Sequence, residues 1–214
     1  KSTMIALSDH SYMTFTDYLA WEIHQDEKYE YLNGEAYAMT GGTIPHNAIA
    51  VNLIASLHGH LRGRSCQVLG SDAKVIISDQ GPSFYPDLVV TCDPRDRGAI
   101  TAIRYPCVII EVLSPTTEHY DRGQKFHHYR RLETLRDYLL VSSDRLNVEL
   151  FHLSDGQKWE FTPYEPDDRV QLASLDFECS IAQIYEDIIF PDPTPTPSIW
   201  ESSVNAHQDS QSNS

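Results

Sequence analysis

The chain has 214 residues, a formal net charge of −15 and an apolar content of 41%. Its length suits one domain with a substantial core, and its acidity is opposite to the basic surface expected of a nucleic-acid binder. No apolar run approaches the ~20 residues that a membrane-spanning helix needs. The start of the chain also lacks the continuous apolar stretch of a secretory signal, so we expect no membrane association.

The first half of the chain predicts two helices on either side of a hairpin. Thr14 and Asp17 have the spacing of a helix capping box. The pair Asn33-Gly34 favours a two-residue turn between strands. The predicted elements are a loose segment (1–12), a helix (14–27), a hairpin (29–32 with 35–39) and a long helix (45–63).

Strands dominate the middle of the chain, where short apolar runs lie between turn residues. The predicted strands are 67–69, 74–77, 85–90, 107–113 and 138–141, with a second hairpin of 148–153 and 159–161 around Asp155-Gly156. The polar stretch 93–104 is expected to form an exposed loop. Helices are expected over 121–135 and 181–188.

The end of the chain has a different composition. Four prolines alternate from Pro191 to Pro197, and a Ser/Asn/Gln-rich stretch follows. Such a segment cannot bury enough apolar surface to become ordered. We therefore expect a Pro/Ser-rich disordered tail over 191–214 and one domain over 13–190. The order of elements predicts a mixed α/β domain, with a sheet of five to seven strands between helices.

The four cysteines are widely scattered, without a C-x-x-C pair or zinc-ligand spacing. They are Cys66, Cys92, Cys107 and Cys179. This pattern favours small buried thiols over a disulfide framework. We expect four reduced cysteines and a cytoplasmic location.

Two acidic residues, Asp87 and Glu111, lie within apolar strands. Desolvating an isolated carboxylate costs at least several kcal/mol unless a charge, a hydrogen-bond network or a metal ion compensates. If the two strands pair with the acidic faces aligned, one Mg²⁺ (or Mn²⁺) could satisfy both carboxylates, with water and substrate phosphate completing its shell. Such an ion activates water and neutralises charge on a phosphodiester. A nearby lysine would position the attacking water or stabilise the oxygens of the pentacovalent phosphorus.

These residues carry a resemblance to a known family. Pro86-Asp87 and Glu111-Val112-Leu113 are similar to the motif of the PD-(D/E)XK nuclease superfamily, except that Leu113 stands where that motif has lysine. Together with Tyr29–Glu35, Pro45-His46, Ser114-Pro115 and residues 121–129, they resemble the Uma2 family. That family is common in cyanobacteria and is described as restriction-type endonucleases. The similarity extends over roughly residues 14–186.

The resemblance implies a restriction-endonuclease-like α/β fold, a mixed central sheet flanked by helices, and metal-dependent hydrolysis of DNA. It implies that Asp87 and Glu111 hold the metal. In that family the lysine has moved to the following helix, where the matching residue is Lys125. Glu30 would add a ligand or a contact. A homodimer would fit a restriction-type enzyme that cuts two strands.

Each candidate residue also has an alternative role. Asp87 could cap a loop or pair with Arg104, and Glu30 could pair with Lys28 or another surface charge. Lys125 could lie on a solvated helix face, and His46 could cap the long helix or lie exposed on the surface. The basic stretch 122–136 either approaches a phosphate backbone or forms a solvated face.

A second function is consistent with the same fold. The net charge of −15, the leucine at position 113 and the lack of an obvious DNA-reading helix fit a catalytically degenerate nuclease-fold protein that acts as a binding or regulatory module. Carboxylate-dependent metal affinity distinguishes the two functions.

Overall fold

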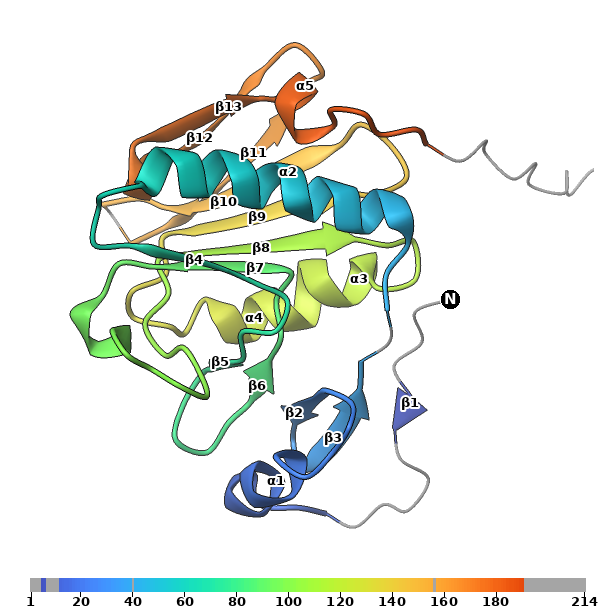
Figure 1. Cartoon of the computed structure of the whole chain (residues 1–214), viewed down its shortest axis with the longest axis vertical. Helices are drawn as coiled ribbons and strands as arrows, with labels where there is room; N and C mark the ends of the chain where they lie inside the picture. Colours follow the sequence, from blue (N-terminus) through green and yellow to red (C-terminus); the bar gives the residue numbers. More distant parts are fainter. Residues whose placement is uncertain (1–4, 7–11, 40, 156, 191–214) are drawn as a thin grey trace, which may run out of the picture.

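The fold is built around a six-stranded sheet with the order β11-β10-β9-β8-β7-β4 (Figure 1). The structure is a computed structural model, and it describes residues 5–6, 12–39, 41–155 and 157–190. The predicted tail 191–214, most of the predicted loose segment 1–12 and Gly156 of the predicted turn lie outside the described residues. The expected mixed α/β fold with a restriction-endonuclease-like central sheet flanked by helices is confirmed.

The central sheet is mixed because one of its pairs is parallel. Its strands are β4 (Gln67–Gly70), β7 (Leu88–Thr91), β8 (Val108–Leu113), β9 (Asp137–Ser142), β10 (Val148–Leu153) and β11 (Trp159–Tyr164). β8 and β9 run parallel, whereas every other neighbouring pair is antiparallel. The middle strands β7, β8 and β9 are buried along their whole length, which explains their near-continuous apolar sequences.

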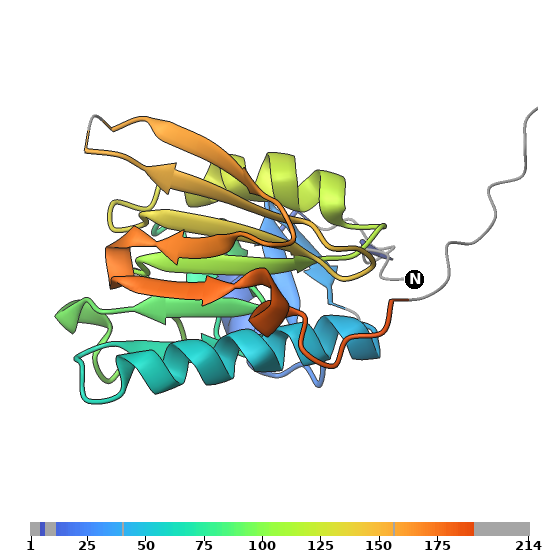
Figure 2. The same cartoon turned by 90° about the horizontal axis from the view of Figure 1, so that it is seen from above.

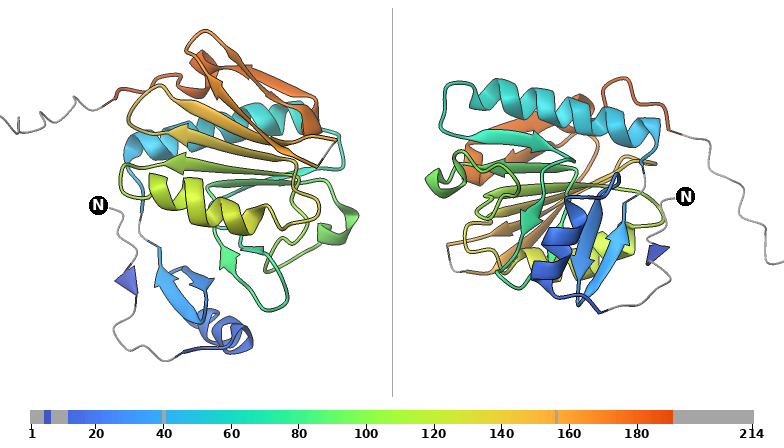
Figure 3. Two further views of the ribbon diagram at one scale, coloured as in Figure 1. Left: turned by 180° about the vertical axis from the view of Figure 1, so that it is seen from behind. Right: turned by 60° about the horizontal axis from the view of Figure 1, so that its bottom comes forward.

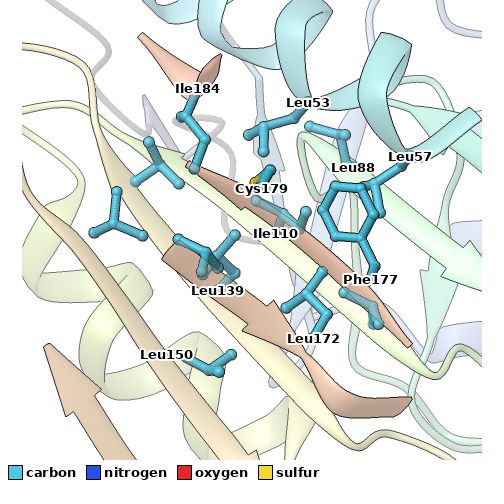
Figure 4. Close-up of a cluster of buried hydrophobic side chains, with 14 of the residues drawn as sticks. Leu53, Leu57, Leu88, Ile110, Leu139, Leu150, Leu172, Phe177, Cys179 and Ile184 are labelled. Carbon is cyan, nitrogen blue, oxygen red and sulfur yellow. The ribbon is translucent and has the colours of Figure 1, made fainter. Parts of the chain in front are cut away.

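One face of this sheet is covered by the long helix α2 (Ile44–Leu61) and the hairpin of β12 (Arg169–Leu172) and β13 (Phe177–Ser180), as Figure 2 shows. The short helix α5 (Ile181–Ile184) follows β13. Leu53 and Leu57 of α2 pack against Ile110 of β8 in the core between these layers (Figure 4). Because strand side chains alternate, Glu111 points to the opposite face.

The opposite face is covered by a helical segment with three parts: α3 (Glu118–Tyr120), the π-helical turn η2 (Asp121–Lys125) and α4 (Phe126–Tyr129). The predicted helix over 121–135 was therefore wrong at both ends. Leu132 and Leu135 are buried in successive tight turns after α4. Their spacing resembles that of a helix, although the chain is not helical there. The wider π turn was not predicted, and it buries both Asp121 and Lys125.

The N-terminal part forms a second, five-stranded sheet with the order β1-β3-β2-β6-β5, below the central sheet (Figure 3). Its strands are β1 (Ile5–Ala6), β2 (Tyr29–Leu32), β3 (Glu35–Ala38), β5 (Val75–Ile76) and β6 (Ser83–Phe84). The predicted hairpin is confirmed, and Asn33 and Gly34 both have the positive φ angles that its turn requires.

Helix α1 (Phe15–Glu22) packs on this sheet and is shorter than predicted. The Thr14 side chain accepts the backbone N–H of Asp17, as the capping box predicts. The buried face of α1 consists of Phe15, Tyr18 and Glu22, whereas Ile23 is 68% exposed. The helix ends at Glu22, and Ile23 lies exposed at its C-terminal end.

Two other expectations required correction. The polar stretch 93–104 contains the 3₁₀ turn η1 (Pro94–Asp96), and the carboxylate of Asp96 is buried. It accepts backbone N–H groups from Arg104 and Tyr105. It also accepts the hydroxyl of Thr91, the last residue of β7, which ties the loop to that strand. The strands β12 and β13 and the 3₁₀ turn η3 (Ala173–Leu175) between them were not predicted, because each strand alternates buried and more exposed residues over only four positions.

The expectation of four reduced cysteines is contradicted, because Cys66 and Cys92 form a disulfide. They flank Gln67 and Thr91, which pair between β4 and β7, so the antiparallel register places the two cysteines opposite each other. The pairing of β4 with β7 joins segments that are distant in the sequence, so the spacing of the cysteines could not predict this disulfide. The cytoplasmic location stays a prediction. Among the described residues, no helix is long and apolar enough to span a membrane.

The packing of α2 on the central sheet generates a stability prediction. Leu53→Ala should lower the free energy of unfolding by about 2–5 kcal/mol, because it leaves a cavity between α2 and β8. Val51→Ala, on the exposed face of the same helix, should change it by less than about 0.5 kcal/mol. Chemical denaturation of both variants measures the difference. Equal effects would contradict this packing.

Candidate active site

A buried lysine lies at the junction of the two sheets and the helical segment. The Nζ atom of Lys125 lies 3.0 Å from Oε1 of Glu30, 3.2 Å from Oε1 of Glu111 and 3.5 Å from Oδ1 of Asp121. All four side chains are at most 7% exposed. They come from β2, β8 and η2, so the fold brings together residues that are far apart in the sequence.

Neighbouring groups fix two of these carboxylates. The hydroxyl of Tyr129 donates to Oε1 of Glu111 at 3.0 Å. The backbone N–H of Tyr85 donates to Oε1 of Glu30 at 3.0 Å. Each of these two carboxylates is therefore held in place by a hydrogen bond as well as by its ion pair with Lys125.

Asp87 lies immediately before β7, where the turn after Pro86 ends, and not inside the strand as predicted. Leu88 pairs with Ile110 in the β7–β8 ladder, so the antiparallel register continues with Asp87 opposite Glu111. The Oδ2 atom of Asp87 accepts the backbone N–H of Val112 at 2.7 Å. The two predicted metal ligands therefore lie opposite each other, with Asp87 just before β7 and Glu111 within β8.

His46 also lies at this site. Its Nε2 atom is 3.3 Å from Oδ2 of Asp87, while Thr43 provides the side-chain cap of α2. Burial lowers the pKa of His46, but Asp87 raises it, and the net shift is upward. A Cβ atom on Gly42 would lie 2.8 Å from Nδ1 of His46, so a larger residue there would displace the imidazole. Because the Thr43 side chain caps α2, the prediction that the His46 side chain caps this helix is wrong.

The site holds more carboxyl groups than cationic groups. Burial raises the pKa of Glu30, Glu111 and Asp121, and Lys125 only partly offsets this effect. Burial opposes the charge on Lys125, yet the three carboxylates raise its pKa well above the usual value. Asp87 adds a further negative charge that raises the pKa of Glu111. One ammonium group thus faces four carboxyl groups.

The donor set fits a hard divalent cation. The Oε2 atom of Glu30 is buried and has no hydrogen-bond partner, which is costly unless another group approaches it. Within the described part of the chain, no group of three or more His, Cys, Asp or Glu side chains is arranged to hold a metal ion. Mg²⁺ commonly takes only one or two protein carboxylates, with water and phosphate oxygens completing the shell. Asp87 and Glu111 meet that requirement.

These groups open into a cavity of about 1000 Å³. The carboxylates of Glu30, Asp87, Glu111 and Asp121 line it together with His46 and Lys125. The first half of α2, the end of β3, the segment 69–74 and the loop 99–103 form its other walls. The cavity is large enough for one or two nucleotides, since ligand pockets commonly have volumes of ~300–1,000 Å³.

The alternative pairings are contradicted. Lys28 pairs with Asp72 at 2.8 Å instead of Glu30, and Arg104 pairs with Asp79 at 3.0 Å instead of Asp87. Lys125 is buried and does not lie on a solvated face.

The basic stretch 122–136 does not line the cavity as a group. Only Lys125 contributes to the lining. Arg122 pairs with Glu118 and Glu149, and Arg136 donates to backbone carbonyl groups. Within the described ranges, the stretch therefore offers this cavity no further cation.

Asp121 and Tyr129 were missed as site residues. The only sequence signal is spacing, because Asp121, Lys125 and Tyr129 recur every fourth residue and so share one side of a helix. That spacing indicates a shared face but not what the face contacts. The leucine at position 113 is buried in the apolar cluster beneath the helical segment.

The comparisons with known proteins agree with this geometry. The Uma2 family model, described as "Putative restriction endonuclease", matches residues 15–182. Two proteins of Synechocystis sp. (strain ATCC 27184 / PCC 6803 / Kazusa) are similar to the chain. "Uncharacterized protein slr1290" is 43% identical over 174 residues, covering 81% of this chain and 92% of that protein. "Uncharacterized protein sll1609" is 29% identical over 161 residues, covering 74% and 91%.

A solved structure shares the fold. It is described as "a putative nuclease belonging to DUF820" from Anabaena variabilis ATCC 29413. It superposes with a TM-score of 0.69 at 18% identity, covering 83% of this chain and 99% of that chain.

The charge balance around Lys125 generates a stability prediction. Lys125→Met should lower the free energy of unfolding by about 3–5 kcal/mol, because three buried carboxylates lose their cation. Lys158→Met, at an exposed lysine, should change it by less than about 0.5 kcal/mol. Denaturant titration provides the measurement.

A double variant makes this prediction more specific. Adding Glu111→Gln to Lys125→Met should recover part of the lost stability, since one of the uncompensated charges is removed. A double variant that is destabilised by the sum of the two single effects would show that the residues do not interact.

Proposed function

Because the chain belongs to the Uma2 family, we propose that it is a metal-dependent endonuclease that hydrolyses DNA phosphodiester bonds. The observation that carries the proposal is the placement of Asp87, Glu111 and Lys125 around one cavity. The acidic excess and the unpartnered Oε2 atom of Glu30 support a site that takes up a divalent cation.

Asp87 and Glu111 would hold Mg²⁺ (or Mn²⁺). When bound, such an ion lowers the pKa of a water molecule and neutralises charge that develops on the phosphodiester. The chain holds these ligands in place through the N–H of Val112 on Asp87 and the hydroxyl of Tyr129 on Glu111. Both donors leave other carboxylate oxygens for the cation.

Lys125 supplies an ammonium group next to Glu111. Its three carboxylate neighbours favour its charged form, so it acts as a hydrogen-bond donor and a fixed positive charge. In that state it orients the attacking water or stabilises the oxygens of the pentacovalent phosphorus. Glu30 and Asp121 hold the ammonium in position from two other sides.

The reaction consumes one water molecule for each bond that is cut. The water oxygen forms a bond to phosphorus, and the bond from phosphorus to one ester oxygen breaks. The products are a phosphate monoester end and a hydroxyl end, with the departing oxygen taking a proton. A homodimer would carry two such sites, one for each strand of a duplex.

The degenerate-scaffold alternative rested partly on the leucine at position 113. That argument weakens because the ammonium of Lys125 lies 3.2 Å from Glu111. The chain's acidity and the lack of an obvious DNA-reading helix remain its other supports, and metal affinity decides between the two functions.

The first test of the proposal is cleavage. With Mg²⁺ or Mn²⁺, the parent should cut plasmid or single-stranded DNA, and EDTA should abolish cutting. Glu111→Gln should reduce the rate by about 100-fold or more, because it removes a charged ligand. Glu160→Gln, at an exposed strand position, is the matched control and should retain full activity. Equal rates for both variants would refute the site.

The second test is metal affinity. Calorimetric titration should show that the parent binds Mn²⁺ and that Asp87→Asn weakens binding at least ~10-fold, since carboxylate charge dominates the affinity for hard cations. Asp79→Asn, at an exposed carboxylate, should leave binding unchanged. A parent without affinity for Mn²⁺ or Mg²⁺ would favour the degenerate-scaffold alternative.

A further inference from the structure

We infer that the substrate strand occupies the cavity unpaired, as single-stranded or locally melted DNA, and is held by base contacts with an apolar wall. This inference rests on the proposed function and specifies the substrate class for the same site. It follows from two features of the cavity lining: its cations are already paired, and an exposed apolar surface lies in the same lining as the carboxylates.

The lysines of the cavity are all neutralised by carboxylates. Lys28 is paired with Asp72 at 2.8 Å, and Lys74 is paired with the buried Glu22 at 2.5 Å. Lys125 is shared among three carboxylates. Besides these lysines, the described lining contains no lysine or arginine, and its only histidine is His46, beside Asp87.

The arginines of the chain do not supply the missing charge. Six arginines make no ion pair among the described residues, and all six lie outside the cavity lining: Arg62, Arg64, Arg97, Arg130, Arg131 and Arg136. Duplex binding commonly neutralises ~6–10 phosphates with lysine and arginine side chains. An acidic cavity without an unpaired cation lacks the means to follow a duplex backbone.

An apolar surface is exposed instead. Ile100 is 96% exposed and Val51 is 54% exposed, and both line the cavity. Ile54, Leu69 and Met39 extend the same lining. Apolar side chains that gather in a concave surface mark a binding site more often than isolated ones do.

Three tyrosines belong to the same lining, of which Tyr85 is buried and Tyr37 and Tyr120 are half-buried. Tyr37 and Tyr120 line the cavity, and neither ring stacks on another aromatic ring among the described residues. A paired duplex hides the faces of its bases, whereas an unpaired strand presents them to apolar and aromatic side chains. The cavity therefore matches the bases of a single strand better than the backbone of a duplex.

The expected binding differs from that of a protein with a basic groove. Phosphate should enter the acidic cavity only together with a divalent cation, whereas the bases should bind with little dependence on monovalent salt. A duplex binder with several phosphate contacts loses ~10³–10⁵ in affinity between ~50 and ~200 mM salt. For this chain and a single strand, we expect a loss of less than about 10-fold over that range.

The test is fluorescence anisotropy with the full chain. The probes are a labelled oligonucleotide of about 12 nucleotides, within the range of single-strand site sizes, and the duplex of the same sequence. Ca²⁺ replaces Mg²⁺ as a hard cation for oxygen ligands, and an EDTA arm measures binding without metal. Each affinity is measured at low and at high monovalent salt.

Ile100→Ser is the diagnostic variant, and Ile189→Ser is its matched control. Ile189 is 86% exposed and lies outside the cavity lining. Both substitutions remove an exposed apolar side chain, so neither should affect folding. Ile100→Ser should weaken single-strand binding by about 3- to 10-fold, as expected for the loss of a base contact. Ile189→Ser should leave it unchanged.

The inference is supported if the single strand binds at least ~10-fold more tightly than the duplex with Ca²⁺, with the shallow salt dependence given above. It is overturned if the duplex binds equally well or better, or if Ile100→Ser behaves like its control. Metal-dependent cutting of a duplex that leaves single strands intact would overturn the inference but support the proposed endonuclease. Metal binding without affinity for either DNA would overturn both.

Discussion

The ion pairs of Lys125 are the interaction on which the rest of the structure depends. One buried ammonium contacts Glu30 of the N-terminal sheet, Glu111 of the central sheet and Asp121 of the helical segment. Without it, three carboxylates would meet in a region from which water is largely excluded, which is costly. The relative positions of β2, β8 and η2 are thus linked to one charge, and the same charge lies at the candidate reaction centre.

The site carries features that stability alone would not favour. An unpartnered carboxylate oxygen and an excess of buried carboxyl groups over cations each cost free energy. The hydrophobic layers on both sides of β8 offset this cost, because Ile109, Ile110 and Val112 are fully buried around Glu111. Such local costs are concentrated where a protein needs unsatisfied groups for binding or chemistry.

Local patterns predicted much of this fold, and contacts between distant segments explain the rest. The turn at Asn33-Gly34 and the leucines of α2 follow rules that act within a few residues. Asp87 and Glu111 stood out because carboxylates are expensive inside apolar strands. The role of Lys125 came from family resemblance, since the π turn that buries it has no clear sequence signal. The Cys66–Cys92 pair depends on the β4–β7 register, which composition does not encode.

The most direct test of the central claim is to locate a bound cation. Crystals of the parent protein soaked in Mn²⁺ should give an anomalous scattering peak at coordination distance, about 2 Å, from the carboxylates of both Asp87 and Glu111. That result would account for the acidic excess that Lys125 leaves uncompensated. Well-diffracting crystals with no peak at these two residues, or with peaks only at surface carboxylates, would contradict the assignment of this cavity as a metal-dependent active site.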